Sequence, residues 1–217
     1  MKKAIVLANG KPPKKRVIEK LRKFGYDYFI CADGGANEAR RLGIIPDLII
    51  GDFDSAKPEV LKYFSGKSKI IHLKRQNDTD VEKALKYAIR KGFGEVLLLG
   101  ATGDRLDHSF CNLGIVLKFF KKIKVKIIHE NSFLIPVAGK TILRTEPGEI
   151  ISVFGFDGKT KFASKHLKYP LKNIPLKFGV RESASNVALK ETIEIKVSGG
   201  VGFLVRDLQK AIEYDGI

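Results

Sequence analysis

The chain has 217 residues, 44% of them hydrophobic, which suits one large domain or two domains of moderate size. Lysine and arginine number 40 against 24 acidic residues, so the formal net charge is +16. The basic residues are spread through almost every segment, and we therefore interpret them as a solvated surface and expect no specific nucleic-acid partner. No stretch approaches the ~20 apolar residues that cross a bilayer. We expect a cytoplasmic protein without a membrane partner.

Several common site types are excluded by spacing. The two cysteines, Cys31 and Cys111, lie far apart among apolar neighbours, so neither a disulfide framework nor a zinc site is indicated. Gly-Lys-Ser/Thr occurs at 66–68, 139–141 and 158–160, but the glycine that a phosphate-binding P-loop requires five positions earlier is absent each time. The four histidines show no metal-ligand spacing.

Short apolar runs alternate with helical patterns as far as about residue 130, which predicts an open, mostly parallel sheet flanked by helices. The expected strands lie at 4–8, 28–32, 48–50, 69–73, 96–99 and 123–129. The expected helices lie at 13–24 and 58–64, after Thr79 and after Asp107, the last with a core stripe of Phe110, Leu113, Leu117 and Phe120.

The most informative turn is Gly51-Asp52-Phe53-Asp54, at the carboxyl end of the apolar run 48–50. Ligands of open α/β sheets bind outside these strand ends. Two carboxylates so close together repel each other unless a cation lies between them or one is protonated. Mg²⁺, which usually arrives with phosphates, would explain the pair. The alternative is a polar turn whose aspartates cap the helix that begins near Pro58.

Two further acidic turns follow strands or begin helices. Asp33 comes directly after the strand 28–32, and the glycines after it let a backbone approach a ligand closely, so Asp33 could accept from a ribose or adenine donor. Asp78 and Asp80 flank Thr79 at a helix N-terminus, where the dipole favours acids. Thr79 and Glu82 have capping-box spacing, yet two acids are more than the cap needs.

A fourth polar turn runs from Gly103 through Arg105 to His108 after the strand 96–99. Arg105 suits a phosphate oxygen, and His108 and Asn112 share one helical face. Eight of the twelve aspartates lie between residues 33 and 107. Polar chemistry that recurs at strand carboxyl ends is typical of an active-site rim.

The sequence changes character from about Phe133. Short β-type runs appear at 141–143, 149–154, 161–163, 192–197 and 202–205, separated by glycine, proline and asparagine. We therefore expect a second domain of antiparallel sheet, with the division at 1–137 and 138–217.

Two other functions compete for these motifs. Asp52-Phe53-Asp54 after an apolar strand resembles the nucleophile motif of haloacid-dehalogenase-like, Mg²⁺-dependent phosphatases, although their lysine motif is not evident. The positive charge also permits a non-catalytic protein that binds nucleotides or nucleic acid.

Taken together, the motifs resemble the thiamine pyrophosphokinase family. The resemblance is carried by the segments 32–37, 46–55, 78–85 and 103–112, and more weakly by 167–171, 177–179 and 185–186. It implies a catalytic α/β domain, a C-terminal β-sandwich that binds thiamine, and a homodimer. The implied reaction moves the pyrophosphoryl group of ATP onto the thiamine hydroxyl and releases AMP. Asp104 stands where the family pattern has a second glycine.

The resemblance also implies roles for individual residues. Mg²⁺ would be held by Asp52, Asp54 and Asp80, and the charge that develops in the reaction would be steadied by Arg105 and His108. The remaining residues would bind the nucleotide: Asp33, Gly34, Gly35, Asn37, Gly51, Asp78, Thr79, Gly103, Asp107 and Asn112. Thiamine would contact Ser185 and Asn186.

Overall fold

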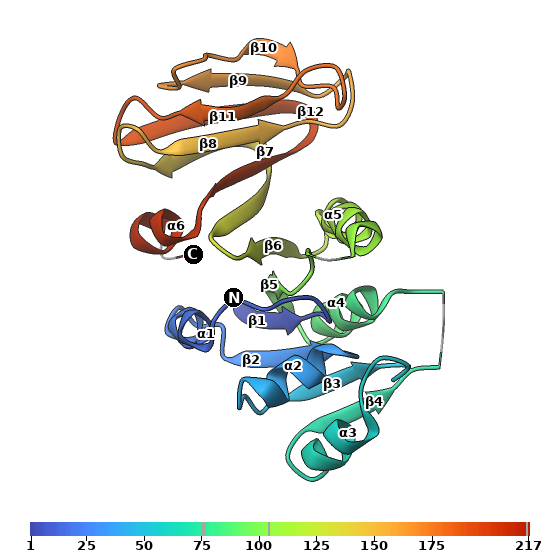
Figure 1. The fold of residues 1–217 in the computed structure, drawn as a ribbon. Helices are drawn as coiled ribbons and strands as arrows, with labels where there is room; N and C mark the ends of the chain where they lie inside the picture. The colour runs from blue at the N-terminus through green and yellow to red at the C-terminus, as the bar shows by residue number, and fades with distance from the viewer. Residues whose placement is uncertain (75–76, 104, 216) are drawn as a thin grey trace. The chain divides into compact units, whose positions relative to one another are not determined.

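The computed structural model describes residues 1–74, 77–103, 105–215 and 217, so the predicted departure at Asp104 lies outside the described residues. The chain divides into two compact units, Met1–Glu130 and Asn131–Ile217 (Figure 1). The expected boundary between 137 and 138 falls inside strand β7 (Ser132–Arg144). That strand pairs with β12 (Thr192–Asp207) on both sides of position 137, which places the whole of it in the second unit.

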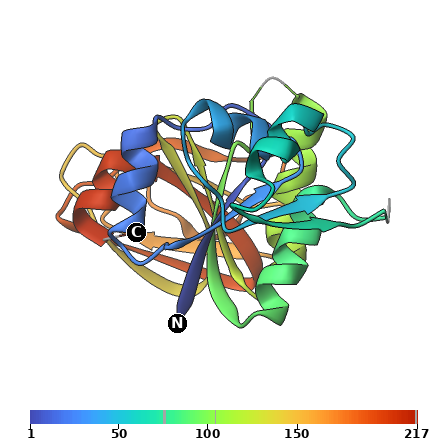
Figure 2. The same cartoon turned by 90° about the horizontal axis from the view of Figure 1, so that it is seen from below.

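The first unit is built on a parallel sheet with the strand order β4-β3-β2-β1-β5-β6. Its strands are β1 (Lys2–Leu7), β2 (Tyr28–Ala32), β3 (Leu48–Gly51), β4 (Lys69–His72), β5 (Phe93–Leu99) and β6 (Lys124–His129). Figure 2 shows β1 entering this sheet from the N-terminus. The central strands are buried along most of their length, as expected for strands covered on both faces.

Helices connect these strands: α1 (Lys15–Arg22), α2 (Gly35–Arg41), α3 (Pro58–Phe64), α4 (Asp80–Arg90) and α5 (Leu106–Phe119). The chain moves outward from β1 to β4, and α4 then carries it back to β5 on the other side of β1. The strand order therefore reverses between β1 and β5, which is where open α/β sheets bind ligands. Within the described residues, no helix combines the length and the apolarity that a membrane crossing requires.

The predicted core stripe of α5 is wrong. Its buried residues are Asn112, Ile115, Val116 and Phe119, whereas Phe110 is 57% exposed. Apolar residues occur around most of this helix, so the 3.6-residue period admits more than one face and did not select the correct one. The correct face brings Asn112 inward.

The second unit is antiparallel. It contains β7, β8 (Ile150–Phe154), β9 (Lys161–Lys165), β10 (Lys172–Pro175), β11 (Ser183–Val187), β12 and the helix α6 (Leu208–Asp215). The two runs expected at 192–197 and 202–205 form one strand, β12, whose register shifts between Val197 and Gly202. Strands β10 and β11 and helix α6 were not predicted, because β10 and β11 are short and largely polar.

Strand β12 pairs with β9 along its first half and with β8 along its second half. Strand β10 continues from β9, and β11 continues from β8. Phe162 of β9 and Ile151 and Val153 of β8 pack into one hydrophobic core. The two branches thus share one hydrophobic interior, as a sandwich requires.

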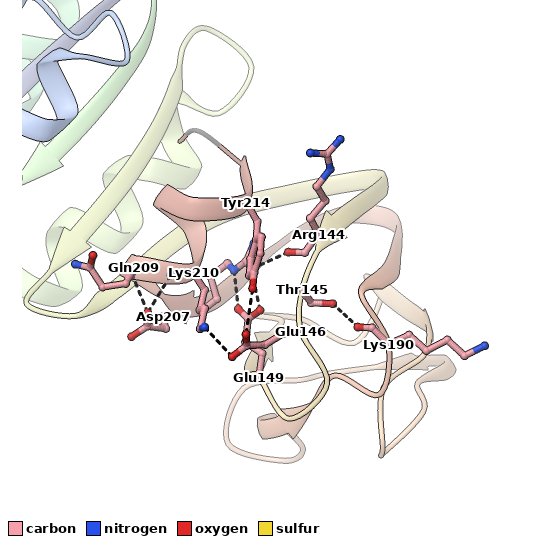
Figure 3. Close-up of polar contacts among 10 residues, drawn as sticks. Arg144, Thr145, Glu146, Glu149, Lys190, Asp207, Gln209, Lys210 and Tyr214 are labelled. Carbon is pink, nitrogen blue, oxygen red and sulfur yellow. Dashed lines mark hydrogen bonds and ion pairs between the residues drawn. The ribbon is translucent and has the colours of Figure 1, made fainter.

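A buried ion pair stabilises the end of β12. Arg206 and Glu149 are almost fully buried, and the Arg206 guanidinium donates through Nε at 2.8 Å and through a terminal nitrogen at 2.9 Å to the two carboxylate oxygens. It also donates to the carbonyl of Arg144 at 2.8 Å. Figure 3 shows the neighbouring Glu146, which Lys210 and Tyr214 of α6 contact. The Glu146 side chain is 43% exposed.

We expect Glu149→Gln to destabilise the protein by about 3–5 kcal/mol, because it leaves the Arg206 charge buried without its counter-charge. Urea unfolding of the wild type and the variant measures this loss. Glu146→Gln is the matched control: it removes an exposed carboxylate from the same region and should change stability only slightly. Equal losses in the two variants would contradict the assignment.

Candidate functional site

A cavity of about 310 Å³ lies at the carboxyl ends of β1, β2 and β5, where the strand order reverses. It is lined by the turns after these three strands, by the start of α4 and by one face of α5. The lining includes the predicted Asp33, Gly34, Thr79, Asp80, Gly103, Arg105, His108 and Asn112.

Glycines let the turns around this cavity pack backbone against backbone. A Cβ atom at Gly35 would lie 2.1 Å from the carbonyl oxygen of Leu7, and one at Gly51 would lie 2.7 Å from the Cβ of Asp33. Both distances are far below normal contact, so these positions require glycine. Because Gly51 has no Cβ, the ends of β2 and β3 can approach each other this closely.

Asp33 is held rigidly between these strand ends. It is 2% exposed and has a left-handed backbone with φ of 43°. Its carboxylate accepts from the backbone N–H of Ala56 at 2.8 Å and of Ser55 at 3.4 Å. Burial, followed by a hydrogen bond with the Asp54 carboxyl, raises the pKa of Asp33 to about 6.

Asp33 is part of an acidic cluster with Asp52 and Asp80. One carboxylate oxygen from each lies within 4.8 Å of the others. The ammonium of Lys83, whose side chain is 3% exposed, donates to Asp52 and to Asp80 at 2.8 Å each. The hydrogen bond from Lys83 is the main reason why the pKa of Asp52 is lowered.

The cluster fits a divalent cation. Oxygens in adjacent positions around Mg²⁺ lie about 3 Å apart and those in opposite positions about 4 Å apart, so the three carboxylates would draw closer together on binding one ion directly. Oδ2 of Asp52 accepts from Lys83, whereas Oδ1 is buried and has no hydrogen-bond partner within 3.5 Å among the described residues. The backbone N–H groups of Asp52 and Asp54 lie near enough to the carboxyl to help lower its pKa. A buried carboxylate oxygen without a partner is costly, and a metal ion would satisfy it.

Asp54 lies beside this cluster. Phe53 has a φ of 63°, which is unusual for a bulky residue, and its ring lies 5.2 Å from that of His72. Asp54 is exposed and accepts from the Ser55 hydroxyl at 2.9 Å. The structure thus places Asp33 next to Asp52 and Asp80, where the family resemblance implied Asp54.

The other predicted residues near α4 carry local contacts. Thr79 caps the helix by accepting from the N–H of Glu82 at 3.2 Å. The Glu82 carboxylate pairs with Lys118 at 2.7 Å. Asp78 pairs with Lys86 at 2.5 Å. Thr79 and Asp78 therefore each have a structural role at the start of α4, whether or not they also bind a ligand.

Asn37 holds the loop that follows Asp54. Its amide donates to the carbonyl of Ser55 at 3.0 Å and accepts from the N–H of Lys57 at 3.0 Å. Both polar atoms of the Asn37 side chain are thus hydrogen-bonded to the loop. Asn37 would contact a nucleotide only by sharing one of these atoms, or would act on it indirectly by holding the loop in shape.

Exposed charges border the cavity at the start of α5. The Arg105 guanidinium pairs with Asp107 through contacts of 2.5 and 3.1 Å, and this pairing lowers the pKa of Asp107 to about 2. His108 is also exposed. Asn112 is buried and donates to the carbonyl of Ala101 at 2.7 Å, which ties α5 to the turn after β5.

Ser185 and Asn186 lie on β11 in the second unit. Ser185 is exposed and has a φ of 53°. The Asn186 side chain is buried and exchanges hydrogen bonds with the backbone of Tyr169 at 3.0 and 2.7 Å. Asn186 therefore has a structural role, and the Ser185 hydroxyl is the more accessible group.

The sequence analysis did not predict site roles for Lys83, Asn9, Gly10 and Thr102. The last three line the cavity. Lys83 follows Asp80 by three positions on a helix, a spacing that could have predicted the ion pair. The role of the turn after β1 follows from the strand order, which no local pattern contains.

Comparisons with known proteins agree with this architecture. A family model described as "Thiamin pyrophosphokinase, catalytic domain" matches residues 23–128, and one described as "Thiamin pyrophosphokinase, vitamin B1 binding domain" matches residues 140–201. The two matches fall in different units of the structure.

Individual relatives extend over most of the chain. Thiamine pyrophosphokinase 2 of Oryza sativa is 29% identical over 198 residues, covering 77% of this chain and 73% of that protein. Thiamine pyrophosphokinase of Bacillus subtilis is 26% identical over 184 residues, covering 82% and 86%. The structure of thiamin pyrophosphokinase from Candida albicans superposes with a TM-score of 0.81 at 20% identity, covering 95% and 89%, which supports the fold.

We expect one carboxyl group of the metal-free protein to titrate near pH 6, and this group to be Asp33. Asp33 should be protonated below that pH and charged above it, so a divalent ion that binds the carboxylate should move the midpoint to lower pH. Carboxyl ¹³C NMR measures the titration, and Asp33→Asn assigns it by removing the signal. A spectrum in which every carboxyl titrates below pH 5 would show that Asp33 is not desolvated as described.

Proposed function

Because the chain belongs to the thiamine pyrophosphokinase family, we propose that Mg²⁺ and ATP bind in the cavity of its first unit. The enzyme transfers the pyrophosphoryl group of ATP to the hydroxyl of thiamine, giving thiamine diphosphate and AMP. The observation that carries the metal assignment is the grouping of Asp33, Asp52 and Asp80, with a buried Asp52 oxygen that has no hydrogen-bond partner in the part of the chain that the structure describes.

Asp52, Asp80 and Asp33 are the residues that would hold Mg²⁺. Asp54 adjoins them through Asp33 and stays a candidate ligand, as the family resemblance implies. When bound, the ion supplies positive charge to the triphosphate oxygens. The protein contributes by carrying the carboxylates at the ends of paired strands and at a capped helix start.

The nucleotide would lie along the turns after β1, β2 and β5. Gly10, Gly34, Gly100 and Gly103 line the cavity at these turns and carry no side chain that would keep a ligand from the backbone. Arg105 and His108 are exposed at its border, where a guanidinium can bind phosphate oxygens and steady the charge that develops on them. Positioning and charge neutralisation are the main requirements of phosphoryl-type transfer.

The second unit would bind thiamine, with Ser185 contributing its accessible hydroxyl and Asn186 holding β11 in shape. We propose a homodimer and a cytoplasmic location on the family resemblance. The phosphatase and the non-catalytic alternatives are not favoured. Both units of the chain match thiamin pyrophosphokinase family models, and the relatives reported above are thiamine pyrophosphokinases.

Asp52→Asn should lower kcat by at least about 100-fold, because one ligand charge and the partner of Lys83 are lost together. The measurement is AMP and thiamine diphosphate formed from ATP and thiamine, with circular dichroism to verify the fold. Asp27→Asn is the control. Asp27 is exposed and precedes the amino end of β2, at the opposite end of the strand from the cavity, so this variant should be as active as the wild type. Wild-type protein that releases ADP or phosphate in place of AMP would overturn the proposed function.

Ser185→Ala should raise the KM for thiamine several-fold and leave the KM for ATP unchanged, because a hydroxyl contact to one substrate is typically worth about 1 kcal/mol. Steady-state kinetics with each substrate varied in turn separate the two effects. Ser183→Ala is a useful comparison, since Ser183 lies on the same strand but is buried against Asn186. An unchanged thiamine KM in the Ser185 variant would place the thiamine site elsewhere.

A further inference from the structure

Lys83 occupies an unusual place for a lysine. Its side chain is 3% exposed, lies on the first turn of α4 and reaches into the acidic cluster. Buried lysines are rare unless they are paired, and this one is paired twice, at 2.8 Å to Asp52 and at 2.8 Å to Asp80. The two partners are also the residues that would hold the divalent ion.

The Lys83 ammonium occupies only one carboxylate oxygen of each partner. It binds Oδ2 of Asp52 and Oδ1 of Asp80, and it leaves Oδ1 of Asp52 buried without a partner among the described residues. One oxygen of Asp52 is therefore fixed by Lys83, while the other remains available. Lys83 need not leave the site for an ion to enter.

The charges of the site follow from this arrangement. Asp33, Asp52 and Asp80 together carry three negative charges when ionised, and Lys83 brings the sum to two. A bare divalent ion that approaches the carboxylates also approaches the ammonium, which repels it. A divalent ion that carries a triphosphate brings negative charge of its own, which the carboxylates repel, and the ammonium offsets part of this repulsion.

We propose that Lys83 is a resident cation of the metal site, which weakens the binding of bare divalent ions to the nucleotide-free site and so favours their entry together with ATP. Lys83 is in this sense a positioning residue: it orients Asp52 and Asp80 and selects the form in which the ion arrives. This inference rests on the proposed function, because it concerns the ion that accompanies the nucleotide.

Titration of the nucleotide-free, full-length protein with Mn²⁺, followed by the EPR signal of the free ion at pH 7.5, tests the proposal. Lys83→Met should bind Mn²⁺ about tenfold more tightly than the wild type, since the nearby positive charge is gone. Lys83→Arg keeps the charge and should bind like the wild type. A purely structural role predicts the reverse, because a disordered cluster would bind Mn²⁺ more weakly.

Lys86→Met is the matched control, since Lys86 lies on the same helix and pairs with Asp78 at 2.5 Å but not with the cluster. Its affinity for Mn²⁺ should stay within about twofold of the wild type, because its charge is more exposed and screened. If Lys83→Met fails to fold by circular dichroism, Lys83→Gln replaces it with the same expectation. Mn²⁺ affinity in the folded variant that is unchanged or weaker overturns the proposal.

The experiment separates this inference from the proposed function. Wild-type protein that makes AMP from ATP and thiamine while Lys83→Met shows no gain in Mn²⁺ affinity would refute the role of Lys83 alone. Mn²⁺ binding that survives Asp52→Asn without loss would instead refute the metal assignment on which both proposals depend.

Discussion

The site depends on holding like charges close together. Three carboxylates with oxygens within 4.8 Å of one another would separate if they were carried on mobile loops. Here Asp33 and Asp52 follow adjacent strands whose backbones meet at Gly51, and Asp80 opens a helix capped by Thr79. The repulsion is opposed by a backbone that is already fixed by sheet hydrogen bonds, and by the Lys83 ammonium between two of the three groups.

This arrangement explains which features of the site the sequence predicts. Each acidic turn was visible because it follows a buried apolar run or begins an amphipathic helix, and both signals are local. The parallel sheet brings carboxyl ends to one edge, so a shared polar rim followed from fold class, whereas the grouping of Asp52 with Asp80 came from the family resemblance. The place of Asp33 within the cluster depends on the pairing of β2 with β3 and on the close approach at Gly51, which are contacts between distant parts of the chain.

The second unit was predicted less completely for a related reason. Strands β10 and β11 are short and mostly polar, and their place is set by pairing with β9 and β8 rather than by an apolar period. The face of α5 failed differently: the helix is apolar on several sides, so periodicity alone did not determine that Asn112 turns inward and Phe110 outward. Tertiary packing decides such cases.

Phe53 adds a constraint on how this protein can change. A bulky residue with a left-handed backbone costs about 1–3 kcal/mol, and here it separates Asp52 from Asp54 at the strand end. Glycine at this position would relieve the strain, while removing the ring that packs against His72 and adding freedom to the unfolded chain. It would also loosen the turn that aims Asp52 at the cluster, so position 53 is one where robustness and activity select different residues.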